Sequence, residues 1–144
     1  MSIQQISVFV ENRPGALQAM TAVLAENGID MRAFSLAETS DFGIARIIVD
    51  DVYKTTTVLR DAGFVHNVTQ VLGVALSDTP GGLDKVLRVL ADAGVNVEYM
   101  YAFLGGKQGK DAYMIFRVAD NAKAAAALAV KGVKQVEQQE MTDL

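Results

Sequence analysis

The chain has 144 residues, of which 51% are hydrophobic and 21% charged, a balance typical of a folded globular protein. Its net charge of −4 argues against binding to nucleic acid or to an anionic membrane surface. The sequence contains no cysteine, which excludes disulfides, thiolate metal sites and a thiol nucleophile. Neither a signal-peptide pattern nor an apolar run of roughly 20 residues occurs, so we expect a cytoplasmic protein.

The first half of the chain predicts the order strand, helix, strand, strand, helix, strand. Alternating apolar residues from Ile6 to Val10 indicate a strand, and apolar residues three and four apart from Leu17 to Leu24 indicate a helix that ends at Gly28. The other expected elements are strands over 30–38, 43–49 and 65–69, and a helix from the N-cap Asp51 to Arg60, with Gly63 after it.

The second half repeats this order. We expect strands over 71–76, 96–103 and 112–118, a helix from about 83 to 94, a helix from the N-cap Asp120 to Gly132, and a closing strand over 134–140. The hairpin in this half is longer and has a glycine-rich tip over 105–110, which lacks the strand-to-helix context of a phosphate-binding loop. Gly73, at the start of this half, either bends the chain or lets strands pack closely.

The two halves are copies of one unit. Residues 8–31 and 74–97 are identical at eight of 24 positions, and such internal repetition indicates a duplicated structural unit. The order βαββαβ is that of the ferredoxin-like split βαβ motif. We therefore predict an α+β fold of two ferredoxin-like units, over 1–70 and 71–144, each an antiparallel sheet with its helices on one face. Units of this size are marginal alone, so we expect them to pack on each other or on a second chain.

The turn before the first helix of each copy is the strongest candidate for a site. Asn12 to Leu17 and Asp78 to Leu83 both place a Pro-Gly pair at the first helical turn, where the amides of residues 15–17 and 81–83 could bind a carboxylate. The side chain of Asn12 or Asp78 could hold an ammonium. A Pro-Gly turn with a capping Asx is also common without a ligand, but in both copies another Asx, Asp30 or Asn96, follows 18 residues later.

This doubled pattern resembles the ACT domain, a regulatory module that binds amino acids. The resemblance covers both copies and implies that a ligand lies at an interface between two modules, in contact with the turn of one and the start of the second strand of the other. If the units pair within the chain, Asn96 joins the first turn and Asp30 the second; a dimer would combine them differently. The candidate ligand-binding residues are Asn12, Arg13, Pro14, Gly15, Ala16, Leu17, Asp30, Asp78, Thr79, Pro80, Gly81, Gly82, Leu83 and Asn96.

Other residues give weaker indications of function. Tyr99, Tyr101 and Phe103 share one face of a strand and could line a ligand pocket, although such a stripe is more often core or a dimer face. His66 is the only histidine, and no nucleophile or metal-ligand cluster accompanies it in the sequence. We therefore predict neither a metal nor a cofactor, and no enzymatic activity.

The function expected from the sequence is that of a non-catalytic regulatory protein that binds a free amino acid at the interface between ACT-like units. Its expected partners are the amino acid, a second copy of the chain in a homodimer and, through the resemblance, an enzyme of amino-acid metabolism; we expect neither nucleic acid nor a membrane. The alternative is a structural protein that assembles with itself or with an enzyme and binds no ligand.

Overall fold

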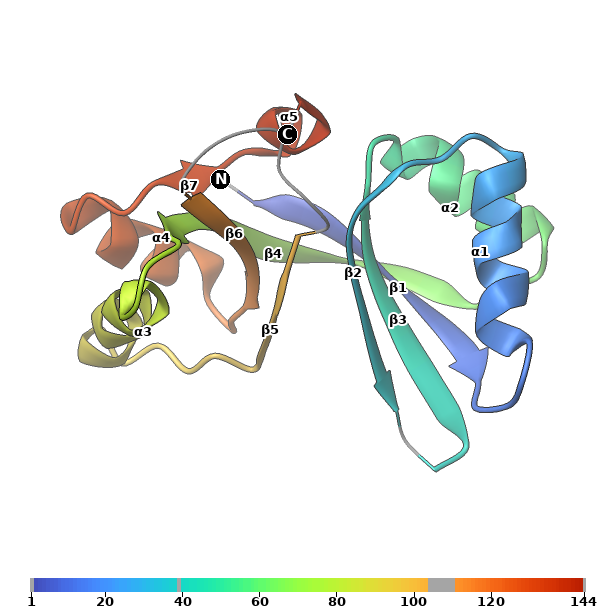
Figure 1. Ribbon diagram of the computed structural model, residues 1–144, viewed down its shortest axis with the longest axis horizontal. Helices are drawn as coiled ribbons and strands as arrows, with labels where there is room; N and C mark the ends of the chain where they lie inside the picture. Colours follow the sequence, from blue (N-terminus) through green and yellow to red (C-terminus); the bar gives the residue numbers. More distant parts are fainter. Residues whose placement is uncertain (1, 39, 104–110, 144) are drawn as a thin grey trace. The chain divides into compact units, whose positions relative to one another are not determined.

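The computed structural model describes residues 2–38, 40–103 and 111–143 (Figure 1). The chain divides into two compact units. We call Gln4–Thr69 the first unit, and Gln70–Leu144 together with Met1–Ile3 the second unit. The domain boundary after residue 70 stays a prediction, and each unit is described by itself.

The first unit has a sheet with the strand order β2-β3-β1-β4. β3 pairs antiparallel with both of its neighbours, for example Val8 with Ala45 and Leu36 with Ala45. The elements that build this unit are β1 (Ile3–Glu11), α1 (Ala16–Glu26), β2 (Met31–Glu38), β3 (Phe42–Val49), α2 (Val52–Asp61) and the beginning of β4 (His66–Ser77).

The second unit repeats this arrangement around the other end of β4. Its strand order is β5-β6-β4-β7, since Gly73 and Val74 of β4 pair with β6 on one edge and with β7 on the other. The elements that follow β4 are α3 (Gly82–Asp92), β5 (Tyr99–Ala102), β6 (Asp111–Arg117), α4 (Asn121–Val130), β7 (Gln135–Val136) and α5 (Gln138–Asp143).

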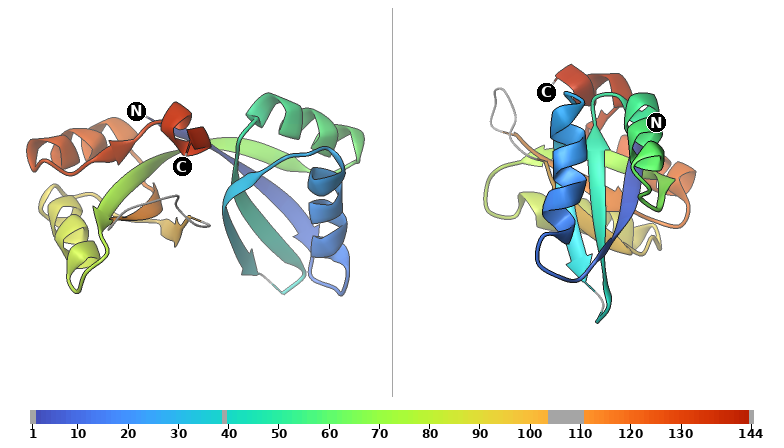
Figure 2. Two further views of the ribbon diagram at one scale, coloured as in Figure 1. Left: turned by 45° about the horizontal axis from the view of Figure 1, so that its top comes forward. Right: turned by 90° about the vertical axis from the view of Figure 1, so that its right-hand side faces the viewer.

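In each unit the alternation of apolar residues directs one face of the sheet onto two helices. Ile6, Val8 and Val10 of β1 share a core with Met20 of α1 and Leu59 of α2, and α1 contacts α2 (Figure 2). The second core has the same arrangement, with alternate residues of β4 packed on α3 and α4; its members include Leu72, Val74, Leu76, Val86, Leu90 and Leu128. The predicted pair of ferredoxin-like βαββαβ units is thereby confirmed.

The second helix of each unit starts and stops as the sequence predicts. The side chain of Asp51 accepts a hydrogen bond from the Lys54 amide at 3.0 Å, and that of Asp120 accepts one from the Lys123 amide at 3.0 Å. Beyond each helix, Gly63 and Gly132 have φ values of 84° and 71°, a left-handed conformation that side chains disfavour. Both helices therefore occupy the same place in their copies, 69 residues apart.

Three sequence predictions about element bounds were wrong. The strands predicted over 65–69 and 71–76 are one continuous strand, β4, whose pairing with β6 runs without a register shift through Gly73. Gly73 therefore makes no bulge there and serves close packing instead: a Cβ atom at this position would lie 2.4 Å from Cδ1 of Ile3. The strand predicted over 96–103 is shorter, because regular pairing begins only at Tyr99.

The third error concerns the end of the chain. Only Gln135–Val136 of the segment over 134–140 forms a strand, and α5 follows it. Glu140 turns back and accepts a hydrogen bond from the amide of Glu137 at 3.3 Å, in the manner of a helix-capping side chain. The glycine-rich tip over 105–110 lies outside the described residues.

Candidate ligand-binding site

The turns before α1 and α3 have the same backbone conformation. Gly15 and Gly81 are the N-cap residues, with φ of 84° and 87°, and neither helix start has a side-chain cap. Pro14 and Pro80 therefore stand immediately before the cap and not in the first helical turn, where the sequence pattern placed them. Glycine adopts this left-handed conformation without strain and has no side chain, so the N-cap residue leaves the start of each helix open.

Only some of the predicted amide donors are available. The amide of Ala16 donates to the carbonyl oxygen of Arg13 at 3.2 Å, and that of Gly82 donates to Thr79 at 3.0 Å, so the prediction that these two amides are free was wrong. The described part of the chain provides no hydrogen-bond acceptor for the amides of Gly15, Leu17, Gly81 and Leu83. Each turn thus keeps two donors at the positive end of a helix dipole.

The side chains that precede each glycine do not cap the helices. The amide of Asn12 donates to the carbonyl oxygen of Asp41 at 3.1 Å, which ties the first turn to the hairpin between β2 and β3. Arg13 forms an ion pair with Glu11, and both side chains are largely exposed. In the second turn the hydroxyl of Ser77 lies 2.8 Å from that of Thr79, so the two turns share their backbone but differ in polar groups.

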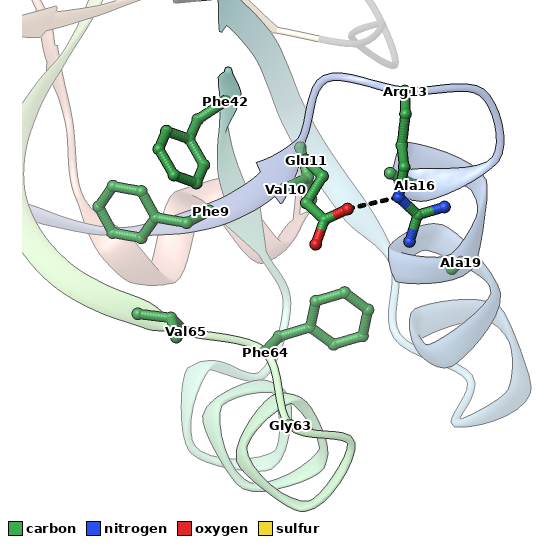
Figure 3. Close-up of a pocket in the computed structure, with 10 residues that line it drawn as sticks. All are labelled: Phe9, Val10, Glu11, Arg13, Ala16, Ala19, Phe42, Gly63, Phe64 and Val65. Atoms are coloured by element: carbon green, nitrogen blue, oxygen red, sulfur yellow. Dashed lines mark hydrogen bonds and ion pairs between the residues drawn. The ribbon is translucent and has the colours of Figure 1, made fainter.

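An open cleft borders the first turn, and we call it the first cleft. It has a volume of about 370 Å³ and lies beside the start of α1 and the residues that enter β4. Figure 3 shows the phenyl ring of Phe42 near that of Phe9, and the Glu11–Arg13 pair between these rings and α1. The lining residues of the first cleft are Phe9, Val10, Glu11, Arg13, Ala16, Ala19, Phe42, Gly63, Phe64 and Val65.

A second cleft of about 520 Å³ borders α3 in the second unit. It is the same feature of the fold, since nine of the ten lining positions of the first cleft have their repeat counterpart in its lining. The backbone agrees: the amide of Phe9 donates to Val65 at 2.9 Å, and that of Ala75 donates to Lys134 at 2.9 Å. The lining residues of the second cleft are Ala75, Leu76, Ser77, Gly82, Lys85, Val86, Val89, Asp111, Lys131, Gly132, Val133 and Lys134.

Asp30 and Asn96 lie away from the turns of their own units. Each follows the C-terminal end of a helix of 11 residues, so about 16 Å of helix separates it from the turn at the other end. Asp30 pairs with Arg32 at 2.9 Å, and its amide donates to the side chain of Asp50 at 3.1 Å. Asn96 lines a third cleft, of about 290 Å³. Within one unit, therefore, the structure does not bring these residues to the candidate turn.

The weaker candidates lie elsewhere. Tyr99 and Tyr101 stack on each other with ring centroids 6.5 Å apart, and Phe103 contacts Tyr113 edge to face; none of these lines the three clefts. The ring of His66 has Nδ1 2.9 Å from the carbonyl oxygen of Phe64. Among the described residues no group of acidic, histidine or cysteine side chains is arranged for a metal ion. Over the same residues, no helix has the length and apolar character needed to cross a bilayer.

The sequence patterns did not reveal the residues that form the far wall of each cleft. The residues after Gly63 and Gly132, together with Phe42 and Asp111, come from parts of the chain distant from the turns. Gly63 and Gly132 are 69 residues apart, as are the N-caps Asp51 and Asp120 of the second helices. Continuing the alignment of the two copies past these glycines at that offset could have identified Phe64, Val65, Val133 and Lys134. Their proximity to the turns depends on the pairing of β1 with β4 in the first unit and of β4 with β7 in the second, which no local pattern reveals.

Comparison with known proteins supports this architecture. The chain matches a crystal structure of a protein from Bacteroides thetaiotaomicron with 37% identity and a TM-score of 0.92, over 100% of this chain and 98% of that one. The regulatory subunits of aspartate kinase from Thermus thermophilus and Thermus flavus share the fold at 18% identity, with TM-scores of 0.65 and 0.63 and coverage of 90% and 88% of both chains. No curated protein matches the chain.

The chain also matches a protein family over its whole length. The ACT domain pair family matches residues 1–144, which confirms the resemblance found in the repeated turn. ACT domains are regulatory, ligand-binding modules. The chain therefore belongs to the ACT domain family, as a pair of ACT domains that spans its whole length.

Proposed function

We propose that this chain is a regulatory protein without catalytic activity that senses a free amino acid at the turns before α1 and α3. The observation that carries the proposal is the repetition of one arrangement: in both units a helix start without a side-chain cap opens beside a cleft. The unoccupied amides suit a carboxylate, and the cleft provides room for a side chain.

The proposal extends to how binding becomes a signal. A ligand that binds one arrangement of the protein better than another shifts the population toward it. The aspartate kinase subunits with this fold are regulatory by name, and an enzyme of amino-acid metabolism is the partner that we propose here. The contribution of Asp30 and Asn96 would have to come from a unit other than the one that supplies the turn, and it stays a prediction.

Thermal unfolding in the presence of each of the twenty amino acids tests this function. A ligand at 100 times its dissociation constant adds about 2.7 kcal/mol to the free energy of unfolding, so a specific ligand raises the midpoint of unfolding well above those of the other amino acids. No shift with any of the twenty would contradict the proposal and favour the alternative of a protein that only assembles with itself or with an enzyme.

Two matched glycine variants locate the site. Gly15→Val places a side chain at the open start of α1, and we expect it to abolish a shift caused by binding there. Gly28→Val is the control: Gly28 has φ of 66° and Gly15 has φ of 84°, and a Cβ atom added at either position would have no neighbour within 4 Å, so both variants carry comparable backbone strain. Gly81→Val with Gly94→Val makes the corresponding comparison in the second unit, where a Cβ atom added at Gly81 has no neighbour within 4 Å and one added at Gly94 lies 3.6 Å from Nζ of Lys123, an ordinary contact. Binding that survives both Gly15→Val and Gly81→Val would place the site elsewhere.

A further inference from the structure

The two clefts occupy equivalent places but differ sharply in charge. In the first, the walls are largely apolar: Phe9 and Phe42 expose 39% and 54% of their surface, and Phe64 and Val65 complete the lining. Among the described residues, the charged side chains in this lining are Glu11 and Arg13, which pair with each other. This cleft offers one cation and one anion for a zwitterion and an apolar surface for a side chain.

In the second cleft, lysines stand at three positions where the first copy has apolar residues. Lys85, Lys131 and Lys134 stand where the first copy has Ala19, Ala62 and Val65, at offsets of 66 and 69 residues. The second cleft also lacks the two exposed aromatic residues of the first, since Asp111 takes the position of Phe42 and Ala75 that of Phe9. Three of the seven lysines of the sequence therefore line one cleft of a protein whose net charge is −4.

The acidic groups near this cleft leave an excess of positive charge. Of the residues that the structure describes, Asp111 is the one that brings a carboxylate to the lining. Lys134 lies 3.8 Å from Glu140, with both side chains about half exposed or more, and ion pairs of this kind contribute little. The lining thus presents three ammonium groups and one carboxylate, the complement of a molecule with more than one anionic group and one cationic group.

From this difference between the copies we infer that the two clefts select different amino acids: the first cleft takes an amino acid with an apolar side chain, and the second one with an acidic side chain. The inference deepens the proposed function and rests on it, since it assumes that both clefts are amino-acid sites. The lysines would hold the two carboxylates of the ligand, with the Leu83 and Gly81 amides nearby as donors, and Asp111 would hold its ammonium.

The second copy can be given the residues of the first. The variant Lys85→Ala/Lys131→Ala/Lys134→Val replaces each lysine by the residue at the equivalent position of the first unit, and all three lysines are exposed. We expect it to weaken binding of glutamate or aspartate, measured by calorimetry, by about five- to tenfold or more for each lysine that contacts the ligand. Lys54→Ala, which removes an exposed lysine on α2, should leave this affinity unchanged.

Further ligands identify what the lysines recognise. Succinate has two carboxylates but no ammonium, and inorganic phosphate is a simple anion; we expect both to bind more weakly than glutamate, and affinity for all three to fall as salt is added. In the wild-type protein, leucine or phenylalanine should bind in a way that the lysine variant leaves intact and that Gly15→Val abolishes.

The outcomes separate the two proposals. Binding of apolar amino acids alone, or binding of glutamate that the lysine variant leaves unchanged, would overturn the inference and leave the proposed function in place. Binding of phosphate or succinate as tight as that of glutamate would also overturn it, because the lysines would then recognise any anion. No response to any of the twenty amino acids would overturn both.

Discussion

Gly82 shows how one residue sets the geometry at the start of α3. A Cβ atom at this position would lie 2.0 Å from the carbonyl oxygen of Ser77, a distance at which the backbone itself must move. The equivalent residue of the first copy is Ala16, which is buried and accommodates its methyl group. The second turn is therefore packed more tightly against the end of its strand than the first.

We predict that Gly82→Ala destabilises the protein. Helix propensity alone would make alanine more stable by up to about 1 kcal/mol, but the clash with Ser77 should reverse this sign and cost about 1 to 3 kcal/mol. Urea denaturation measures the difference in the free energy of unfolding. The control is Ala16→Gly at the equivalent position, which should cost no more than about 1 kcal/mol; a gain in stability for Gly82→Ala would contradict the close contact.

At the scale of elements, α2 and α4 depend on the residues that cap them. Asp51 and Asp120 each bind an amide of the first helical turn, and a carboxylate also interacts favourably with the positive end of the helix dipole. Asp61, in contrast, is the last residue of α2, where the dipole is negative. The same residue type thus has opposite effects at the two ends of one helix.

We therefore expect opposite signs from three aspartate substitutions. Asp51→Ala and Asp120→Ala should each lower the free energy of unfolding by about 1 kcal/mol, because a capping hydrogen bond is lost. Asp61→Ala should change it little or raise it by about 0.3 kcal/mol, because an unfavourable charge is removed. Chemical denaturation of the three variants at low salt checks this; equal losses at Asp51 and Asp61 would show that the cap contributes nothing specific.

These caps also explain which elements could be predicted. Aspartate before a helix and glycine after it are local signals, so both second helices were located from sequence. The beginning of α5 has such a signal in Glu137 and Glu140, but the prediction of a fourth strand obscured it. The continuity of β4 carries no local signal, because Gly73 is compatible with a bend as well as with close packing, and only the position of Ile3 decides between them.

The candidate site was predicted only in part for a related reason. The turns are contiguous in sequence, and their repetition made them visible. The far walls of the clefts come from residues brought in by strand pairing, so Phe42 and Lys134 were not recognised as neighbours of the turns. The charge difference between the clefts lies partly in these residues, since Lys134 stands at the position of Val65 and Asp111 at that of Phe42.

At the scale of the whole molecule, the first residues of the chain belong with its second half. Ile3 is buried, and its Cδ1 atom occupies the space above Gly73. Gly73→Ala should therefore cost about 1 to 3 kcal/mol. Ile3→Val removes the obstructing atom at a cost of about 0.5 to 1.5 kcal/mol.

A double-mutant cycle tests this contact. In the Ile3→Val background the cost of Gly73→Ala should fall by at least about 0.5 kcal/mol, because the two side chains no longer compete for the same space. Some cost should remain, since Val136 also lies within 3.3 Å of the added Cβ. Strictly additive effects, measured as free energies of unfolding, would show that Ile3 does not lie against Gly73.

The unbroken strand β4 limits how this protein can be taken apart or recombined. The two units meet at Thr69 and Gln70, inside a strand that runs from His66 to Ser77, so the junction offers a protease regular strand backbone and not a loop. An engineer who wishes to exchange one copy for a sensor of another metabolite must cut through hydrogen-bonded backbone and also carry over residues 1–3. Replacing side chains inside a cleft, while leaving the shared strand intact, is the safer route to new specificity.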